Sequence, residues 1–211
     1  MITIFALKAA PAFAQGLVRD LRVRWALEEA GLPYAVTLIE RGEQASNAYR
    51  ALQPFGQVPV FQEDGLTLFE SGAIVLHIGV RSEVLLPKDT AGRARAMMWL
   101  LAALNSIEVP AQRLFELDIF YAGQDWVKDY RPLVEARTKL RLAELAKALG
   151  EQDYLDGRFT AGDLMMAAVL RLLRNTDLLA GEPKLVAYQE RCEARPAFQR
   201  ALRDQMATFA G

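Results

Sequence analysis

Residues 53–61 read QPFGQVPVF and residues 68–74 read LFESGAI, and these two stretches decide the fold. The first is a Pro-x-Gly turn followed by a short apolar run, after which Glu63–Gly65 turns the chain into a second apolar run. Two short apolar runs joined by such a turn are typical of a β-hairpin. Glu70 and Ser71 follow as a polar helix start with apolar residues behind them, so we expect a helix directly after the hairpin.

Pro59 lies early in the first predicted strand. Proline has no N–H to contribute to a sheet ladder, so we expect this position at a sheet edge or at an unusual backbone geometry. A cis peptide bond between Val58 and Pro59 is one such geometry.

Together, the two stretches resemble the glutathione site of cytosolic glutathione S-transferases of the bacterial type. The resemblance rests on Gln-Val-Pro-Val at residues 57–60 and on Glu-Ser-Gly-Ala-Ile at residues 70–74, at a spacing and a depth in the chain that match the family. In that family the proline is cis and closes a thioredoxin-like site. The resemblance therefore implies that the protein binds glutathione as a co-substrate.

The chemistry of glutathione suits these residues, because the molecule is an anionic peptide with an amino group, two carboxylates and a thiol. An open strand edge at Val58, beside Pro59, can pair with its backbone, as peptides add to sheet edges. The N-terminus of the helix after Phe69 presents N–H groups and positive potential to a carboxylate, and Ser71 can add its hydroxyl. Glu70 can pair with the ammonium group. The resemblance implies the same roles for these positions.

The loop Arg41–Gln44 resembles the family's segment in which a His, Lys or Gln meets the glycyl carboxylate of glutathione. Gln44 is the candidate for this contact, with Gln57 beside it. Both glutamines are equally compatible with exposed loop positions that bind nothing.

Activation of the thiol departs from the family pattern. Glutathione transferases usually place a Tyr, Ser or Cys near the start of the first helix to stabilise the thiolate, which is the reactive species. Between Ile4 and Pro33 this chain has no Ser, Thr, Tyr or Cys. We expect that Arg19, as the leading choice, or Gln15 or Lys8 stabilises the thiolate together with N–H groups of the loop.

Two alternatives stay open for the thiol. A donor can come from the helical part of the chain, for example Tyr121 or Tyr130, or the protein binds glutathione without transferring it. The predicted function is the conjugation of glutathione thiolate to an apolar electrophile. Its rivals are a non-catalytic glutathione-binding, ligand-binding or interaction protein of the same fold, and a glutathione-dependent lyase or isomerase.

Composition indicates a folded protein, and the net charge does not favour a strongly charged partner. Of the 211 residues, 52% are hydrophobic and 24% are charged, which is typical of a globular rather than a disordered chain. The net charge of −1 gives no reason to expect nucleic acid or a membrane as a partner. Cys192 is the only cysteine, so we expect no intrachain disulfide and no metal site. Residues 1–8 lack the layout of a signal peptide, and a cytoplasmic protein is expected.

The first part of the chain alternates between strand and helix patterns. Residues 2–7 read as a strand, residues 17–30 as a helix that Gly31 ends, and residues 34–39 as a second strand. A helix between two strands predicts a βαβ unit with a parallel strand pair. With a short helix expected within residues 42–53, the order β-α-β-α-β-β-α resembles the thioredoxin-like half of a glutathione transferase.

Residues 81–92 are the expected boundary, because the chain reads as helical throughout after them. We predict an α/β thioredoxin-like N-terminal domain at residues 1–80, a linker at residues 81–92 and an all-α C-terminal domain at residues 93–211, which is the glutathione transferase fold. The resemblance also implies a homodimer. Met97–Trp99 are expected in the core, in the dimer interface or in an apolar substrate pocket.

The second part of the chain contains clear helix signals. A long helix is expected from Arg93 to about Tyr121, with a bend near Pro110. Pro132 is expected to open another helix. The leucines that share one face of it are Leu133, Leu140, Leu145 and Leu149.

Thr160 and Asp163 form a capping-box pattern, which predicts the start of a buried central helix over Leu164–Leu173. Pro183 and Pro196 are expected to lead two further helices.

Two single residues have chemistry of their own. The only histidine, His77, is expected to have a packing or surface role rather than a catalytic one. Cys192 is expected to be half buried and inert.

Overall fold

The structure is a computed structural model that describes residues 1–210. It divides into two compact units. One unit comprises Met1–Pro87 together with the described residues from Arg195 onward, and the other comprises Lys88–Ala194. The last helix of the chain therefore belongs to the same unit as the first strand.

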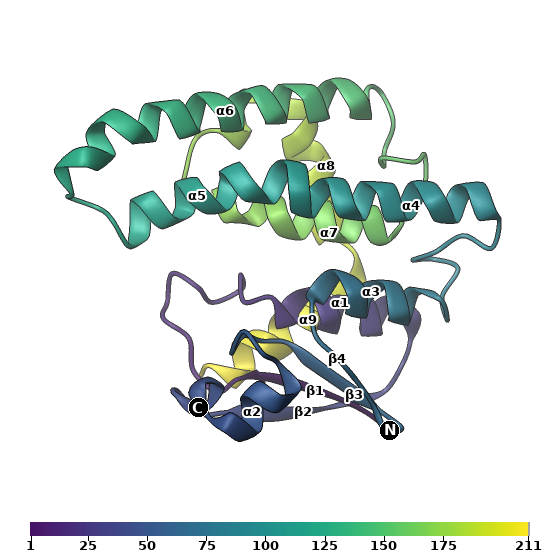
Figure 1. Ribbon diagram of the computed structural model, residues 1–211. Helices are drawn as coiled ribbons and strands as arrows, with labels where there is room; N and C mark the ends of the chain where they lie inside the picture. Colours follow the sequence, from purple (N-terminus) through teal and green to yellow (C-terminus); the bar gives the residue numbers. More distant parts are fainter. Residues whose placement is uncertain (211) are drawn as a thin grey trace. The chain divides into compact units, whose positions relative to one another are not determined.

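A four-stranded sheet forms the centre of the first unit (Figure 1). The strand order is β2-β1-β3-β4, with β1 and β2 parallel, and with β3 antiparallel to both β1 and β4. The strands are β1 (Ile2–Leu7), β2 (Tyr34–Ile39), β3 (Val60–Glu63) and β4 (Leu66–Leu68). The parallel pair and the hairpin confirm the sheet that the sequence predicts.

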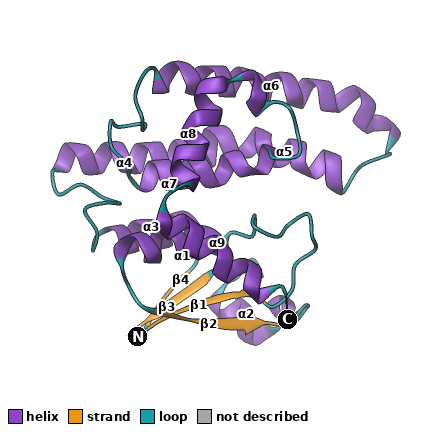
Figure 2. Cartoon of the chain, turned by 180° about the vertical axis from the view of Figure 1, so that it is seen from behind, coloured by secondary structure: helices purple, strands orange, loops and turns teal. Residues whose placement is uncertain are grey.

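Helices cover both faces of this sheet (Figures 1 and 2). One face carries α1 (Asp20–Ala30), α3 (Ser71–Gly79) and α9 (Pro196–Thr208). The other face carries α2 (Asn47–Leu52), which follows a 3₁₀ turn at Glu43–Ala45. The short helix expected within residues 42–53 is thus confirmed.

Side chains of β1 alternate between the two faces of the sheet, so this strand contributes to the core on both faces. Phe5 and Leu7 pack against a cluster that includes Ile39 and Val60 of the sheet and Tyr49 of α2. Because successive side chains of a strand point to opposite faces, the other residues of β1 point toward α1 and α3. These buried residues are Ile2, Ile4 and Ala6.

The helix predicted over residues 17–30 begins at Asp20 instead. The N–H groups of Leu17 and Leu21 bond to carbonyls only three residues earlier, so the chain enters α1 through tight turns rather than a regular helix. The end of the helix is as predicted, because Gly31 caps it in the left-handed conformation with φ +65°.

Three charged residues of α1 are buried. Asp20, Arg22 and Arg24 are 1%, 4% and 2% exposed. Arg24 Nε donates to Asp20 Oδ2 at 2.7 Å, and Gln205 Nε2 of α9 donates to Asp20 Oδ1 at 2.7 Å. Burial raises the pKa of Asp20, and Arg24 and Gln205 offset part of that rise.

The second unit is built from helices (Figure 1). Its α-helices are α4 (Thr90–Ala102), α5 (Glu108–Ile119), α6 (Asp125–Leu149), α7 (Ala161–Leu170) and α8 (Pro183–Glu193), with a π-helical turn at Ala103–Ile107 and 3₁₀ turns at Arg171–Leu173 and Leu179–Gly181. Every residue of α7 is buried, which confirms the predicted central helix. Gly162 permits the close contact of α7 with α4, because a Cβ at this position would lie 2.5 Å from Cβ of Trp99.

The long helix expected from Arg93 to about Tyr121 is present as one continuous helical run made of α4, the π-helical turn and α5, and it differs from the expectation in two respects. The helix starts earlier, at Thr90, where the side chain of Asp89 caps it. It is also divided by the π-helical turn Ala103–Ile107, which lies just before Pro110. Proline offers no N–H to the carbonyl four residues earlier, so the regular hydrogen-bond pattern is already disturbed at this point.

Pro132 does not open a helix but lies inside α6. The carbonyl that loses its N–H partner belongs to Lys128, an exposed residue, so water can satisfy it. The common face predicted for the leucines is also wrong. Leu145 and Leu149 are buried, whereas Leu133 and Leu140 are 67% and 57% exposed.

Cys192 is fully buried in α8 rather than half buried. His77 packs edge-on against Phe61, with ring centroids 5.4 Å apart, and its Nε2 lies 3.6 Å from Oε2 of Glu63. Over residues 1–210, no helix is long and apolar enough to cross a membrane.

The predicted capping box at the start of α7 is present and has more partners than the sequence pattern requires. The Thr160 N–H donates to Asp163 Oδ2 at 2.9 Å, and the Gly162 N–H donates to Thr160 Oγ1 at 3.2 Å. Asp163 Oδ1 accepts from the Leu155 N–H at 2.8 Å and from the Tyr188 hydroxyl at 3.1 Å. One buried carboxylate therefore joins α7, α8 and the loop between α6 and α7.

Replacing this carboxylate is expected to destabilise the second unit strongly. Asp163→Ala leaves buried donors unpaired, and we expect it to lower the free energy of unfolding by roughly 3 kcal/mol. Urea unfolding measures the loss. Asp163→Asn keeps one acceptor oxygen, so its free energy of unfolding should lie between those of the wild type and Asp163→Ala. The control is Asp177→Ala at an exposed position, where a change within about 0.5 kcal/mol is expected. Equal effects at both positions would contradict the role of Asp163.

Candidate functional site

The β3–β4 hairpin brings two parts of the candidate site to one end of the sheet. Phe61 pairs with Leu68 in the antiparallel register. The residues just before β3 and those just after β4 therefore lie at the same end of the hairpin. The peptide bond between Val58 and Pro59 is cis, as the resemblance implies.

Val58 presents a backbone segment that the fold leaves open. It is half buried and lies just before β3, and Pro59 after it is buried. Within residues 1–210, neither the amide nor the carbonyl of Val58 has a hydrogen-bond partner. An extended peptide can therefore pair with this backbone as an additional strand would.

The N-terminus of α3 lies at the same end of the hairpin as this open backbone. The first helical hydrogen bond of α3 runs from the Ile74 N–H to the Glu70 carbonyl, so the N–H groups before Ile74 point out of the helix start. They present positive potential to an anion. Glu70 is exposed and has φ +69° and ψ 111°, a backbone conformation that side-chain-bearing residues rarely adopt. Such strained residues often occur at functional sites.

Arg22 of α1 contacts the start of α3. It is a residue of the candidate site that the sequence does not predict. Its Nη1 donates to Ser71 Oγ at 3.3 Å, and both side chains are 4% exposed. The Ser71 oxygen accepts this bond, so its own hydrogen is available to a ligand. In the sequence, Arg22 reads as one of several charged residues on a helix surface, and no local pattern distinguishes it.

The turn before Val58 is held by buried polar contacts. Gln53 Oε1 accepts from the Phe55 N–H at 2.6 Å. Gly56 adopts φ +64°, and a Cβ there would lie 2.8 Å from the carbonyl oxygen of Gln44. The close approach allowed by Gly56 therefore brings the backbone of Gln44 next to residues 56–57.

Tyr49 of α2 is a second residue that the sequence analysis missed. Its hydroxyl donates to the carbonyl of Gln57 at 2.7 Å. Burial, together with the nearby charge of Glu43, raises the pKa of Tyr49 to about 12, so the hydroxyl remains a donor at neutral pH. This bond fixes the backbone immediately before Val58.

The two candidate glutamines lie near this backbone. Gln44 is partly exposed, and its Oε1 accepts from the Gly42 N–H at 2.8 Å. In the described chain, no partner occupies the Nε2 of Gln44, so this donor is open to a carboxylate. The side chain of Gln57 is exposed.

The residues proposed from sequence to activate a thiol lie in and beside the loop between β1 and α1. Gln15 Nε2 donates to the Ala10 carbonyl at 3.0 Å, so this amide is engaged within its own loop. Lys8 forms an ion pair with Glu40. Arg19 immediately precedes α1 and is partly exposed.

The two tyrosines considered as alternative donors belong to the second unit. The ring of Tyr121 lies 5.4 Å from that of Trp126, centroid to centroid. Tyr130 lies on α6.

The arrangement around Val58 suits an extended, zwitterionic peptide. The open backbone can pair with a peptide backbone, the start of α3 with Ser71 can hold a carboxylate, and Glu70 can hold an ammonium group. Within residues 1–210, no group of three His, Cys, Asp or Glu side chains is placed to hold a metal ion.

Comparisons with known proteins show that the chain is similar to glutathione S-transferases. The sequence model of the glutathione S-transferase N-terminal domain matches residues 15–79. Glutathione S-transferase F14 of Arabidopsis thaliana is 30% identical over 188 residues, which cover 82% of this chain and 74% of the relative.

Solved structures extend the similarity to the fold. A glutathione transferase from Burkholderia graminis, with two glutathione molecules bound per subunit, has a TM-score of 0.83 and 25% identity over 95% of this chain and 87% of its own. A theta-class glutathione S-transferase from Xanthomonas axonopodis pv. citri, with glutathione bound, has a TM-score of 0.77 and 27% identity over 95% of this chain and 96% of its own.

The role of Tyr49 can be tested without a ligand. Tyr49→Phe removes the hydrogen bond to the Gln57 carbonyl, so we expect the free energy of unfolding to fall by about 1 kcal/mol. We also expect faster hydrogen exchange at the amides of residues 56–58, measured by mass spectrometry. Tyr154→Phe is the control, because its hydroxyl has no hydrogen-bond partner in the described part of the chain. Unchanged exchange at residues 56–58 in Tyr49→Phe would show that the bond does not hold this turn.

Proposed function

Because the chain belongs to the glutathione S-transferase family, we propose that it binds glutathione in residues 1–80 and transfers the glutathione thiol to an apolar electrophile. The observation that carries the proposal is the open backbone of Val58, which lies at the same end of the hairpin as the N-terminus of α3. The open backbone of Val58 fits the peptide backbone of glutathione, and the N-terminus of α3 fits one of its carboxylates.

Each candidate residue then has a defined task. The amide and carbonyl of Val58, beside Pro59, pair with the glutathione backbone, and the Ser71 hydroxyl with the α3 amides holds the carboxylate of its γ-glutamyl part. Glu70 pairs with the ammonium group of the same part. The other end of glutathione is a glycyl carboxylate, for which Gln44 and Gln57 supply amide donors.

The thiol is the part of glutathione for which the residues differ from the family pattern. The loop between β1 and α1 contains no Ser, Thr, Tyr or Cys, so no side-chain hydroxyl or thiol of that loop can stabilise the thiolate. We propose that the Arg19 guanidinium stabilises the thiolate electrostatically, with Gln15 and backbone N–H groups of the loop. A cation near a thiol lowers its pKa because it favours the charged form.

The absence of a hydroxyl donor also favours a second candidate function. A protein of this fold that binds glutathione without activating it is a carrier or an interaction module. The pKa of the thiol of bound glutathione distinguishes the two functions, because only a transferase needs the thiolate.

The thiolate absorption of glutathione, titrated against pH with and without the protein, is the direct measurement. Free thiol ionises near the cysteine reference of about 8.5, and we expect a clearly lower pKa for the bound molecule. Arg19→Gln should move this pKa back toward the free value, whereas Arg203→Gln, at an exposed position on α9, should not. Binding with an unshifted pKa contradicts the transferase and supports the carrier.

Glu70 provides a test of how glutathione is oriented. Glu70→Gln removes the partner of the ammonium group, so we expect about tenfold weaker binding of glutathione by calorimetry. A glutathione analogue without the amino group should bind the wild type and Glu70→Gln with similar affinity. The control is Asp64→Asn, at an exposed turn position with φ +48° that asparagine tolerates. Equal losses for both ligands would contradict the assigned orientation.

We further propose a homodimer in the cytoplasm. The family supports both statements, and exposed apolar side chains on α4 fit a subunit interface. These are Met97, Met98 and Leu101, which are 38%, 52% and 48% exposed.

A further inference from the structure

A pocket with a volume of about 410 Å³ lies in the first unit, between α1, α9 and the outer strand β2. The residues that line it include Arg24 and Glu28 of α1, Tyr34 and Val36 of β2, and Asp204 of α9. Its volume is within the range of pockets that bind small organic molecules. None of the residues proposed above to bind glutathione lines this pocket.

The inner wall of the pocket contains a buried guanidinium with unpaired donors. Arg24 is 2% exposed, and within residues 1–210 the one hydrogen bond of its guanidinium is that from Nε to Asp20. Its Nη2 is buried and has no partner there. Buried donors are almost always paired, because an unpaired donor has lost the hydrogen bonds that water would supply. An acceptor atom of a ligand at this wall would satisfy such a donor.

The exposed side of the pocket contains a carboxylate without a partner. Asp204 is exposed, and among the described residues its carboxylate has no hydrogen bond or ion pair. Glu28 differs, because Arg200 Nε donates to its Oε2 at 2.6 Å. The charge of Arg24 is likewise balanced by Asp20. The unbalanced charge of the pocket is therefore negative, which favours a cationic ligand.

Tyr34 adds an uncharged polar group near these charges. Burial raises the pKa of Tyr34 to about 12, the Arg24 guanidinium opposes the rise, and the carboxylates of Glu28 and Asp204 add to it. The Tyr34 hydroxyl is therefore close enough to all three side chains to respond to their charges. It stays protonated at neutral pH and can bond to a ligand as donor or acceptor.

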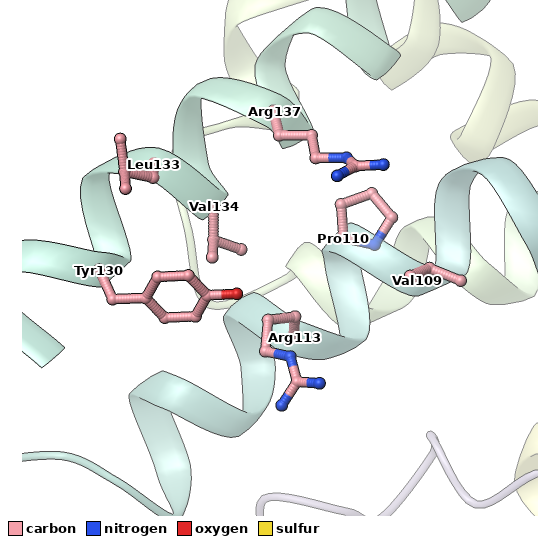
Figure 3. A pocket seen from close by; sticks show the side chains of 7 residues that line it. All are labelled: Val109, Pro110, Arg113, Tyr130, Leu133, Val134 and Arg137. Atoms are coloured by element: carbon pink, nitrogen blue, oxygen red, sulfur yellow. The ribbon is translucent and has the colours of Figure 1, made fainter.

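The pocket between α5 and α6 of the second unit differs from this one (Figure 3). Its polar side chains are those of Arg113, Tyr130 and Arg137, all of which are exposed, so water can satisfy their donors. The guanidinium of Arg24 has little contact with water. Its unpaired donors are therefore the stronger indication of a ligand.

We propose that the pocket of the first unit binds a small α-amino amide, in which an ammonium group lies next to a neutral carbonyl and an apolar side chain. The ammonium group pairs with Asp204, the carbonyl oxygen accepts from the Arg24 guanidinium, and the apolar side chain packs against Val36. A free amino acid fits less well, because its carboxylate adds negative charge to a pocket that already has an unpaired carboxylate. A plain alkylamine leaves the donors of Arg24 unpaired. The site is additional to the glutathione site and does not rest on the proposed function.

The probe for a direct test is leucinamide, titrated at neutral pH into the full chain labelled with ¹⁵N and followed by the amide signals in NMR spectra. We expect a dissociation constant on the order of 1 mM, given the few atoms of the ligand, with the largest signal shifts at residues 34–36 and 203–205. Two analogues each lack one feature, since N-acetyl-leucinamide has no ammonium group and isopentylamine has no carbonyl. Both should bind about threefold or more weakly than leucinamide, because each loses a charge-assisted hydrogen bond.

Variants of the two charged residues assign the contacts. Asp204→Asn removes the partner of the ammonium group at an exposed position and should weaken leucinamide binding about fivefold. The matched control is Asp64→Asn, at the exposed turn position, which should leave the affinity for leucinamide unchanged. Arg24→Lys keeps a cation beside Asp20 but lacks the Nη groups, so leucinamide should bind this variant no better than isopentylamine does.

A competition experiment separates this site from the glutathione site, because saturating glutathione should not displace leucinamide. The proposal is overturned if the wild type does not bind leucinamide, if Asp204→Asn and the wild type bind it equally, if either analogue binds as tightly as leucinamide, or if glutathione displaces it. Loss of glutathione binding in the wild type with leucinamide binding intact would instead contradict only the proposed function.

Discussion

The first unit depends on the pairing of the charges that α1 carries into its interior. A buried charge is costly unless it is hydrogen-bonded and paired, so each such residue requires a partner from elsewhere in the fold. Asp20 receives bonds from Arg24 of its own helix and from Gln205 of α9. The partner from α9 lies 185 residues further along the chain. The last helix thus completes the polar interior of a unit whose sheet is built from the first 70 residues.

The same buried layer reaches the candidate glutathione site. Arg22 lies on α1 between Asp20 and Arg24, and its guanidinium bonds to Ser71 at the start of α3. This contact orients the serine oxygen and adds positive charge behind the helix N-terminus. A carboxylate bound at α3 would therefore experience the helix dipole, the Ser71 hydroxyl and a nearby guanidinium together. The interactions that stabilise the fold thus also prepare this part of the site before any ligand arrives.

The sequence predicts those features whose cause is local. The Gln57–Val60 and Glu70–Ile74 motifs, the glycine at the end of α1 and the Thr160–Asp163 capping box depend on turn and cap chemistry within a few residues, and the structure contains each of them. The start of α1 and the interior position of Pro132 differ from the local signals, because tight turns precede α1 and the carbonyl that Pro132 leaves unpaired belongs to an exposed residue. The buried partners Arg22 and Tyr49 were missed for a different reason. Their contacts lie 49 and 8 residues away, and their identities alone resemble an exposed charge and a core aromatic residue.

The proposed glutathione site can be recognised in the sequence although it depends little on reactive side chains. We assign its ligand contacts mainly to backbone groups of Val58 and α3, so its signature in the sequence is a pattern of Pro, Gly and Ser that shapes the backbone. Such a pattern is local, and the structure contains its consequences at Pro59 and Glu70.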